Sequence, residues 1–143
     1  MHVLVAGCTG EIGKELLPIL NEHANIQRVT VLVRREFRSE FQKIVPIIVD
    51  FERLTETQLP KVDVAICCLG STMAKAGSKS KFERVDLDYV LAFAKLAKHN
   101  GATQFHVISA AGANKTSLFF YNRVKGMMEE EIRKMNFTSS CIY

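Results

Sequence analysis

The chain has 143 residues, of which 48% are hydrophobic and 24% are charged, and its formal net charge is +4. This composition is typical of a single folded domain and excludes a disordered or collagen-like chain. The first residues enter a strand directly, without the basic and apolar segments of a signal peptide, and no stretch approaches the ~18 apolar residues of a membrane span. We therefore expect a cytoplasmic protein without membrane contact.

The predicted elements begin with a strand near residues 2–7 and a helix near residues 11–22. The strand is a short aliphatic run with few polar residues, which is typical of a strand buried on both faces of a parallel sheet. In the helix, apolar residues recur at helical spacing, although Pro18 weakens the helix interior. The chain therefore opens as strand, turn and helix.

The turn between these two elements, GCTGEIG, carries a glycine at every third position. Gly7 allows a tight turn, Gly10 allows a pyrophosphate to approach the backbone, and Gly13 allows the helix to pack on its strand. This spacing is a variant of the dinucleotide-binding fingerprint. An ordinary strand-to-helix turn is the alternative interpretation, and the rest of the chain has to decide between the two.

The four cysteines lie in or beside predicted strands, at spacings that fit no zinc site: they are Cys8, Cys67, Cys68 and Cys141. Buried, reduced thiols are therefore expected. Cys8 is a partial exception, because the field at the N-terminus of the following helix is expected to lower its thiol pKa and raise its reactivity.

The second predicted strand, near residues 28–33, ends in TVLVRR, which places Arg34 and Arg35 directly after it. At this position of a dinucleotide-binding fold, a carboxylate binds the ribose 2′-hydroxyl of NAD, whereas an arginine accommodates the 2′-phosphate of NADP. The pair therefore predicts NADP(H) as the cofactor. Two solvated arginines after a buried strand are the alternative interpretation.

Two further predicted strands, near residues 44–49 and 62–69, also end in candidate cofactor residues. Asp50 and Phe51 follow the first of them, and Asp50 is either an acceptor for the adenine amino group or a cap for the next helix. The second strand ends in CCLGST, where Gly70 again allows bare backbone to pass close to the cofactor.

The segment KAGSKSK gathers three of the basic residues, Lys75, Lys79 and Lys81. It lacks the interleaved aromatic residues of a single-strand nucleic-acid surface. We interpret it as a solvated loop and expect no nucleic-acid partner.

The remaining elements continue the alternation, with a helix near residues 82–100, a strand near 104–109, a helix near 118–135 and a last strand opened by TSSCIY. Parallel strands joined by helices imply right-handed crossovers and a ligand at the carboxyl ends of the strands. The sequence thus predicts a single α/β domain over residues 1–143, with a Rossmann-type, doubly wound parallel sheet and helices on both faces.

The candidate catalytic residues lie in the last third of the chain. The motif YNRVK places Tyr121 and Lys125 one helical turn apart, and Ser109 closes the preceding strand. A phenol ionises near pH ~10, and a nearby ammonium favours the phenolate, so that a tyrosine can exchange a proton while a nicotinamide exchanges hydride. A serine hydroxyl can hold the substrate oxygen. For Tyr121 alone, an amphipathic ring at a helix start is the alternative.

These motifs resemble the short-chain dehydrogenase/reductase superfamily, whose Tyr-x-x-x-Lys pair and glycine turn match YNRVK and GCTGEIG. Within it, the sequence is similar to the atypical branch that contains the human HIV Tat-interacting protein and bacterial relatives. The segments that carry this similarity extend over nearly the whole chain: VTVLVRR, VDFERL, CCLGSTMAKAG, VDLDYVLAFAKLAK, FHVISAAGA and GANKTSLFFYNRVKG.

The resemblance implies a Rossmann fold that binds NADP(H). It implies cofactor contacts from Thr9, Gly10, Glu11, Ile12, Arg34, Arg35, Leu69 and Gly70. The glycine turn and the strand ends described above add Gly7, Gly13, Asp50 and Phe51 to the candidate cofactor residues. The resemblance also implies a reaction centre of Tyr121 and Lys125, with Lys125 also at the cofactor. Ser109 is followed by Ala110, whereas relatives carry two adjacent serines here.

Two functions stay open. One is an NADP(H)-dependent oxidoreductase acting on a small carbonyl or alcohol, and the other is an NADP(H)-binding regulatory or interaction protein with little turnover. Relatives in this branch continue past a strand like TSSCIY into a segment that shapes the substrate pocket, and this chain stops at Tyr143. We therefore expect an absent C-terminal substrate-binding portion, poor turnover, and a homo-oligomer or protein partner at the uncovered edge.

Overall fold

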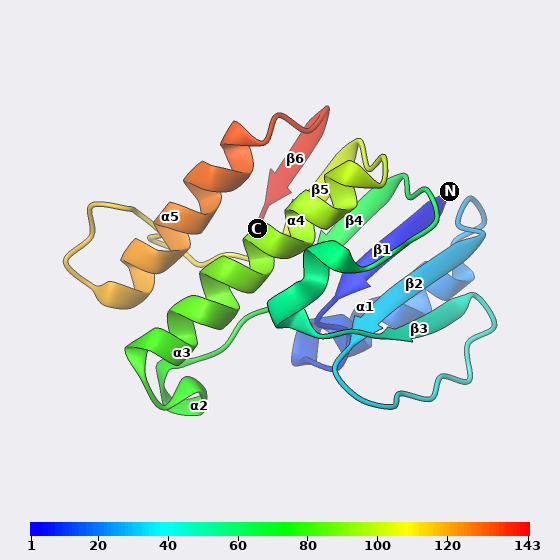
Figure 1. Ribbon diagram of the computed structural model, residues 1–143, viewed down its shortest axis with the longest axis horizontal. Helices are drawn as coiled ribbons and strands as arrows, with labels where there is room; N and C mark the ends of the chain where they lie inside the picture. The colour runs from blue at the N-terminus through cyan, green and yellow to red at the C-terminus, as the bar shows by residue number, and fades with distance from the viewer.

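Six strands form one parallel sheet in the computed structural model, which describes residues 1–143 (Figure 1). The strands are β1 (His2–Ala6), β2 (Arg28–Val33), β3 (Ile44–Ile48), β4 (Val64–Cys67), β5 (Gln104–Val107) and β6 (Ser139–Ile142). Their order across the sheet is β3-β2-β1-β4-β5-β6, and every neighbouring pair is parallel. This is the strand order of a Rossmann fold, so the predicted fold class is confirmed.

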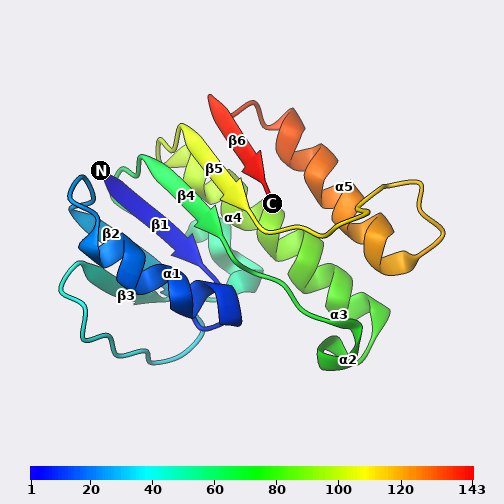
Figure 2. The same ribbon diagram turned by 180° about the vertical axis from the view of Figure 1, so that it is seen from behind.

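The helical elements cover both faces of this sheet, as predicted. They are α1 (Glu11–Glu22), the 3₁₀ helix η1 (Phe51–Glu56), α2 (Met73–Ala76), α3 (Lys79–Glu83), the π turn η2 (Arg84–Asp88), α4 (Tyr89–His99) and α5 (Phe120–Lys134). α4 and α5 lie in front of the sheet in Figure 1, whereas Figure 2 shows α1 on the opposite face.

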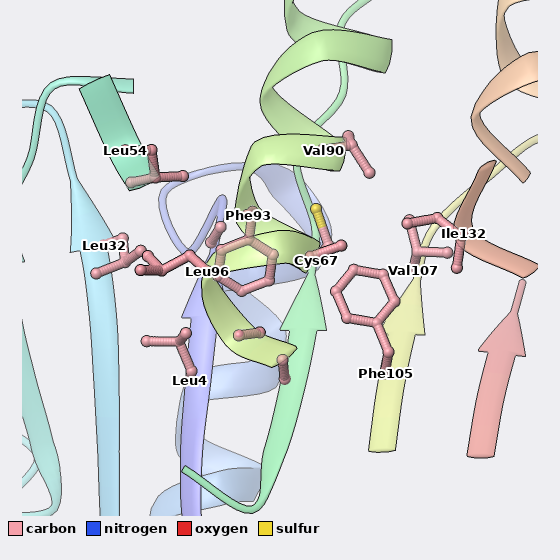
Figure 3. Packing of buried hydrophobic residues seen from close by; sticks show 14 of the residues in the cluster. Leu4, Leu32, Leu54, Cys67, Val90, Phe93, Leu96, Phe105, Val107 and Ile132 are labelled. Atoms are coloured by element: carbon pink, nitrogen blue, oxygen red, sulfur yellow. The ribbon is translucent and has the colours of Figure 1, made fainter. Parts of the chain in front are cut away.

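The core is divided into two layers by the sheet, because successive side chains of a strand point to opposite faces. In β1, Leu4 and Ala6 belong to the larger cluster, whereas Val3 and Val5 belong to the smaller cluster, which also contains buried residues of α1. Figure 3 shows Val90, Phe93 and Leu96 of α4 packed over β1, β4 and β5. Burial on both faces explains why the central strands read as continuous apolar runs.

The helix that follows β4 differs from the expected one. The helical run begins at Lys79, earlier than the predicted start near residue 82, and its middle forms the π turn η2 before it continues as α4. The short helix α2 before it was not predicted. Hydroxyl caps start both short helices: Thr72 Oγ1 accepts the Lys75 N–H at 3.1 Å, and Ser78 Oγ accepts the Lys81 N–H at 3.2 Å.

Candidate functional site

A cavity of about 600 Å³ lies where the strand order reverses, at the carboxyl ends of the central strands. Many of the predicted cofactor residues line it: Gly7, Thr9, Gly10, Arg34, Arg35, Phe51, Leu69 and Gly70. These residues come from the turn after β1 and from the segments after β2, β3 and β4. The sheet therefore brings together residues from four separate parts of the sequence.

The glycine turn has no room for side chains at two of its three glycines. Gly7 has a φ of +83°, and a Cβ there would lie 2.5 Å from the Cys68 carbonyl carbon. A Cβ on Gly13 would lie 2.2 Å from the Gly7 carbonyl oxygen. At Gly10 the corresponding distance is 3.4 Å, and Gly10 begins α1 without a side-chain cap. The first N–H groups of α1 therefore have no side-chain acceptor and suit an anion.

Four of the other predicted cofactor residues do not line the cavity. Glu11 and Ile12 are exposed on the first turn of α1, and Gly13 packs on the turn itself. Asp50 caps η1, because its Oδ1 accepts the Glu52 N–H at 2.9 Å. Of the two interpretations of Asp50, the structure thus has the one in which its side chain caps the next helix. Contacts of these four residues with a cofactor stay predictions.

Lys125 lies in a buried ion pair instead of on an open surface. Its Nζ is 2.6 Å from Oδ1 of Asp86, and the two side chains are 3% and 0% exposed. The contact has the geometry of an ion pair and not of an aligned hydrogen bond. The other carboxylate oxygen of Asp86 accepts the Ser71 N–H at 2.9 Å. Burial raises the pKa of the Asp86 carboxyl above its ordinary value, and Lys125 and the Ser71 N–H oppose that shift.

This ion pair lies directly behind one wall of the cavity. A Cβ built on Gly70 would be 3.5 Å from Asp86 Oδ1 and 3.7 Å from Lys125 Nζ. Asp86 therefore connects α5, through Lys125, to the backbone at residues 70–71 that lines the cavity.

The sequence analysis missed Asp86, although a signal was present. Asp86 falls on the same helical stripe as the buried residues Phe82 and Val90, four positions away on either side. A carboxylate on a buried stripe needs a partner to offset its desolvation. That signal indicates a buried pair, but it does not name Lys125 as the partner.

The other two predicted catalytic residues also contact protein side chains. The Ser109 hydroxyl donates to Glu129 Oε1 at 2.6 Å. The ring of Tyr121 packs against Phe82, with 5.2 Å between ring centroids. Neither residue lines the cavity described above. The structure thus places Tyr121 and Lys125 on the first two turns of α5 and Ser109 beside Glu129, farther along the same helix, and their catalytic roles stay predictions.

The prediction for Cys8 is wrong. The thiol is buried, and burial raises its pKa to about 11, although a hydrogen bond from its own backbone lowers it slightly. Desolvation of the thiolate outweighs the favourable field at the start of α1. Cys67 and Cys68 are shifted in the same direction, to about 12 and about 11, also because of burial. These three thiols therefore suit packing better than nucleophilic chemistry.

Residues 2–85 match the family described as semialdehyde dehydrogenase, NAD binding domain. Among curated proteins, the chain is 38% identical to Protein HTATIP2 of Rattus norvegicus, over 99% of this chain and 60% of that protein. It is 30% identical to Protein FMP52, mitochondrial, of Candida albicans, over 99% of this chain and 65% of that protein. The chain therefore spans less than two thirds of the length of these relatives.

Solved structures share the fold at low identity. The human epimerase family protein SDR39U1 (isoform 2) with NADPH superposes with a TM-score of 0.72 at 18% identity, over 99% of this chain and 52% of that one. The UDP-glucose 4-epimerase of Thermotoga maritima superposes with a TM-score of 0.77 at 14% identity, over 99% of this chain and 54% of that one. Both likenesses concern the fold.

The expectation of a cytoplasmic location is wrong on this comparison, because several of the similar fungal proteins are named mitochondrial. The expectation rested only on the default that follows from an N-terminus without a recognised targeting signal. In the structure, no helix has the length and apolar character required to cross a membrane.

Proposed function

The chain belongs to the semialdehyde dehydrogenase NAD-binding domain family, and on that premise we propose that its cavity binds NADP(H). In this proposal the protein is an oxidoreductase that acts on a small carbonyl or alcohol. The observation that carries the choice of NADP(H) is the pair Arg34 and Arg35. Both line the cavity after β2, and neither has a carboxylate partner within ion-pair distance. Guanidinium groups at this place suit a 2′-phosphate.

The glycine turn fits the phosphates of a dinucleotide. Gly7 and Gly13 close the turn tightly, and Gly10 leaves bare backbone at the start of α1. The cofactor would supply or accept the hydride. Tyr121 would give or take the proton at its phenolic oxygen, Lys125 would contribute positive charge beside it, and Ser109 would orient the substrate oxygen.

A test of the cofactor choice is a fluorescence titration with NADPH and NADH. We expect NADPH to bind roughly tenfold to a hundredfold more tightly, because charged hydrogen bonds to phosphate contribute about 1.5–3 kcal/mol. Replacing Arg34 and Arg35 together by alanine should remove most of that preference. Arg28→Ala is the matched control, because Arg28 is exposed at the opposite end of the same strand. Equal affinities of the parent for both cofactors would contradict the proposal.

A second candidate function, an NADP(H)-binding regulatory or interaction protein with little turnover, is favoured by one observation. Lys125 and Ser109 both contact acidic side chains, Asp86 and Glu129, instead of facing the cavity.

Tyr121→Phe separates the two functions in a carbonyl-reduction assay. In an oxidoreductase the variant should bind NADPH like the parent and turn over ~100-fold or more slowly, because it lacks only the phenolic hydroxyl that exchanges the proton. The phenyl ring keeps the contact with Phe82, so the unfolding temperature should stay unchanged. Turnover equal to that of the parent would make Tyr121 a packing residue, and no turnover by the parent would favour the second function.

A further inference from the structure

We propose that Lys75 and Lys81 form a second basic wall of the cavity and bind phosphate groups of the dinucleotide together with Arg34 and Arg35. This inference rests on the proposed cofactor. It changes the interpretation of KAGSKSK from a solvated loop to part of the binding site, and it concerns a segment that follows β4, far in sequence from the glycine turn.

The position of the two lysines is set by the fold. Figure 2 shows the chain leaving the arrowhead of β4, at the carboxyl edge of the sheet, and passing into α2 and α3. Lys75 on α2 and Lys81 on α3 both line the same cavity as the two arginines. The hydroxyl oxygens of Thr72 and Ser78 accept the backbone N–H of Lys75 at 3.1 Å and of Lys81 at 3.2 Å. These caps define where each short helix begins and therefore where each lysine lies.

The charges that line the cavity are unbalanced. Four cations, Arg34, Arg35, Lys75 and Lys81, have no carboxylate within 4.0 Å. A fifth, Arg84, is paired with Glu52 at 3.2 Å. The only acidic residue in the lining, Glu36, is itself 3.1 Å from Arg38.

This imbalance points to an anionic ligand. Like charges gathered in one concave site repel one another and raise the local positive potential, which attracts and orients a polyanion. Lys115, Arg133 and Lys134, by contrast, each have a glutamate partner at 2.6–3.1 Å. A dinucleotide with a pyrophosphate and a 2′-phosphate carries enough negative charge to offset the four free cations.

Lys79 provides an internal control. It lies in the same motif and on the same short helix as Lys81, yet it does not line the cavity. Its Nζ lies instead over the ring of Phe120, 5.3 Å from the ring centroid. Replacing Lys79 therefore removes the same charge from the same segment without removing a group from the cavity wall.

The experiment is a titration of the parent, Lys79→Ala, and the double variant Lys75→Ala with Lys81→Ala, using NADPH and NADH at low and at physiological ionic strength. We expect the double variant to bind NADPH roughly ten- to a hundredfold more weakly and with a smaller dependence on salt. Lys79→Ala should stay within about twofold of the parent. Both lysines are exposed, so unfolding temperatures should not change.

The two cofactors identify which phosphate is bound. An equal loss for NADPH and NADH assigns the lysines to the pyrophosphate, and a loss confined to NADPH assigns them to the 2′-phosphate; both results support the proposal. A double variant with the affinity and salt dependence of the parent overturns it while leaving the proposed cofactor intact. A parent that binds neither cofactor overturns both.

Discussion

Two regions of this domain are built in different ways: the cavity region, which consists of the residues that line the cavity and the rest of the glycine turn, and the α5 region, which consists of Ser109, Tyr121, Lys125 and their side-chain partners. In the cavity region, backbone and glycines shape the site, and four of the five cations that line it have no carboxylate partner. In the α5 region, each predicted catalytic side chain is held by another side chain: Lys125 by Asp86, Ser109 by Glu129, and Tyr121 by Phe82. A site made by backbone is set by the fold itself, whereas a site made by side chains depends on which partners those side chains have.

The two regions should therefore be sensitive to different kinds of substitution. Steric changes should damage the cavity region, because its shape has no spare volume at Gly7 and Gly13. Changes of charge should damage the α5 region, because it contains the buried pair of Lys125 and Asp86. The following changes test that difference.

The largest effect is expected for Asp86→Ala in the α5 region. The substitution leaves the Lys125 ammonium buried without a counter-charge, which typically costs ~3–5 kcal/mol of unfolding free energy. Urea unfolding measures this loss. Replacing both residues, with Asp86→Leu and Lys125→Met, should recover most of it, because an apolar pair needs no compensation. A single variant within about 1 kcal/mol of the parent would show that water or another group solvates Lys125.

A smaller loss of unfolding free energy is expected for Gly13→Ala in the cavity region. The new methyl group would lie 2.2 Å from the Gly7 carbonyl oxygen, so α1 has to move away from the turn. Overpacking of this kind costs ~1–3 kcal/mol, and the shift should also remove cofactor binding. Gly10→Ala is the control. Its Cβ would lie 3.4 Å from the Gly7 carbonyl oxygen, so this variant should keep the stability of the parent and lose only its affinity for the cofactor. Equal stability of Gly13→Ala and Gly10→Ala would refute the steric argument.

The smallest effect concerns His106 on β5. Burial lowers the pKa of its imidazole below the ordinary value, so the unfolded chain takes up the proton first as the pH falls. Stability should therefore be fully present above the unfolded pKa of ~6.5 and decline slightly as the pH falls below it. His106→Asn should flatten this decline in thermal unfolding between neutral and mildly acidic pH. Removing the exposed His99 in the same way should leave the decline in place.

The succession of strands and helices along the chain, the glycine turn and the arginines after β2 follow from local patterns, and the structure has the strands and α1 where the sequence predicts them. Periodicity also predicts that Tyr121 and Lys125 share one helix, and they do. These features depend on neighbours within a few residues, which is the range over which apolar spacing and turn chemistry are informative.

What could not be predicted depends on contacts between distant segments. The pairing of Asp86 with Lys125 requires η2 and α5 to be adjacent, and the contact of Ser109 with Glu129 requires the register of α5 against β5. The pKa of Cys8 was predicted from a local helix field, but the shift is dominated by burial, which the whole fold determines. Lys75 and Lys81 were assigned to a solvated loop because their shared cavity is formed only by the assembled sheet.

The π turn between α3 and α4 has a consequence for how related chains can be compared. A π turn is one residue longer than the α-helical turn that it replaces, so the helical run Lys79–His99 holds one extra residue while its two ends stay nearly in phase. Deleting one residue from 84–88 would convert the π turn into an α-helical turn and leave the preceding turn nearly in the same orientation relative to α4. A homologue with a one-residue gap in this segment is therefore expected to keep a lysine on α3 that faces the cavity.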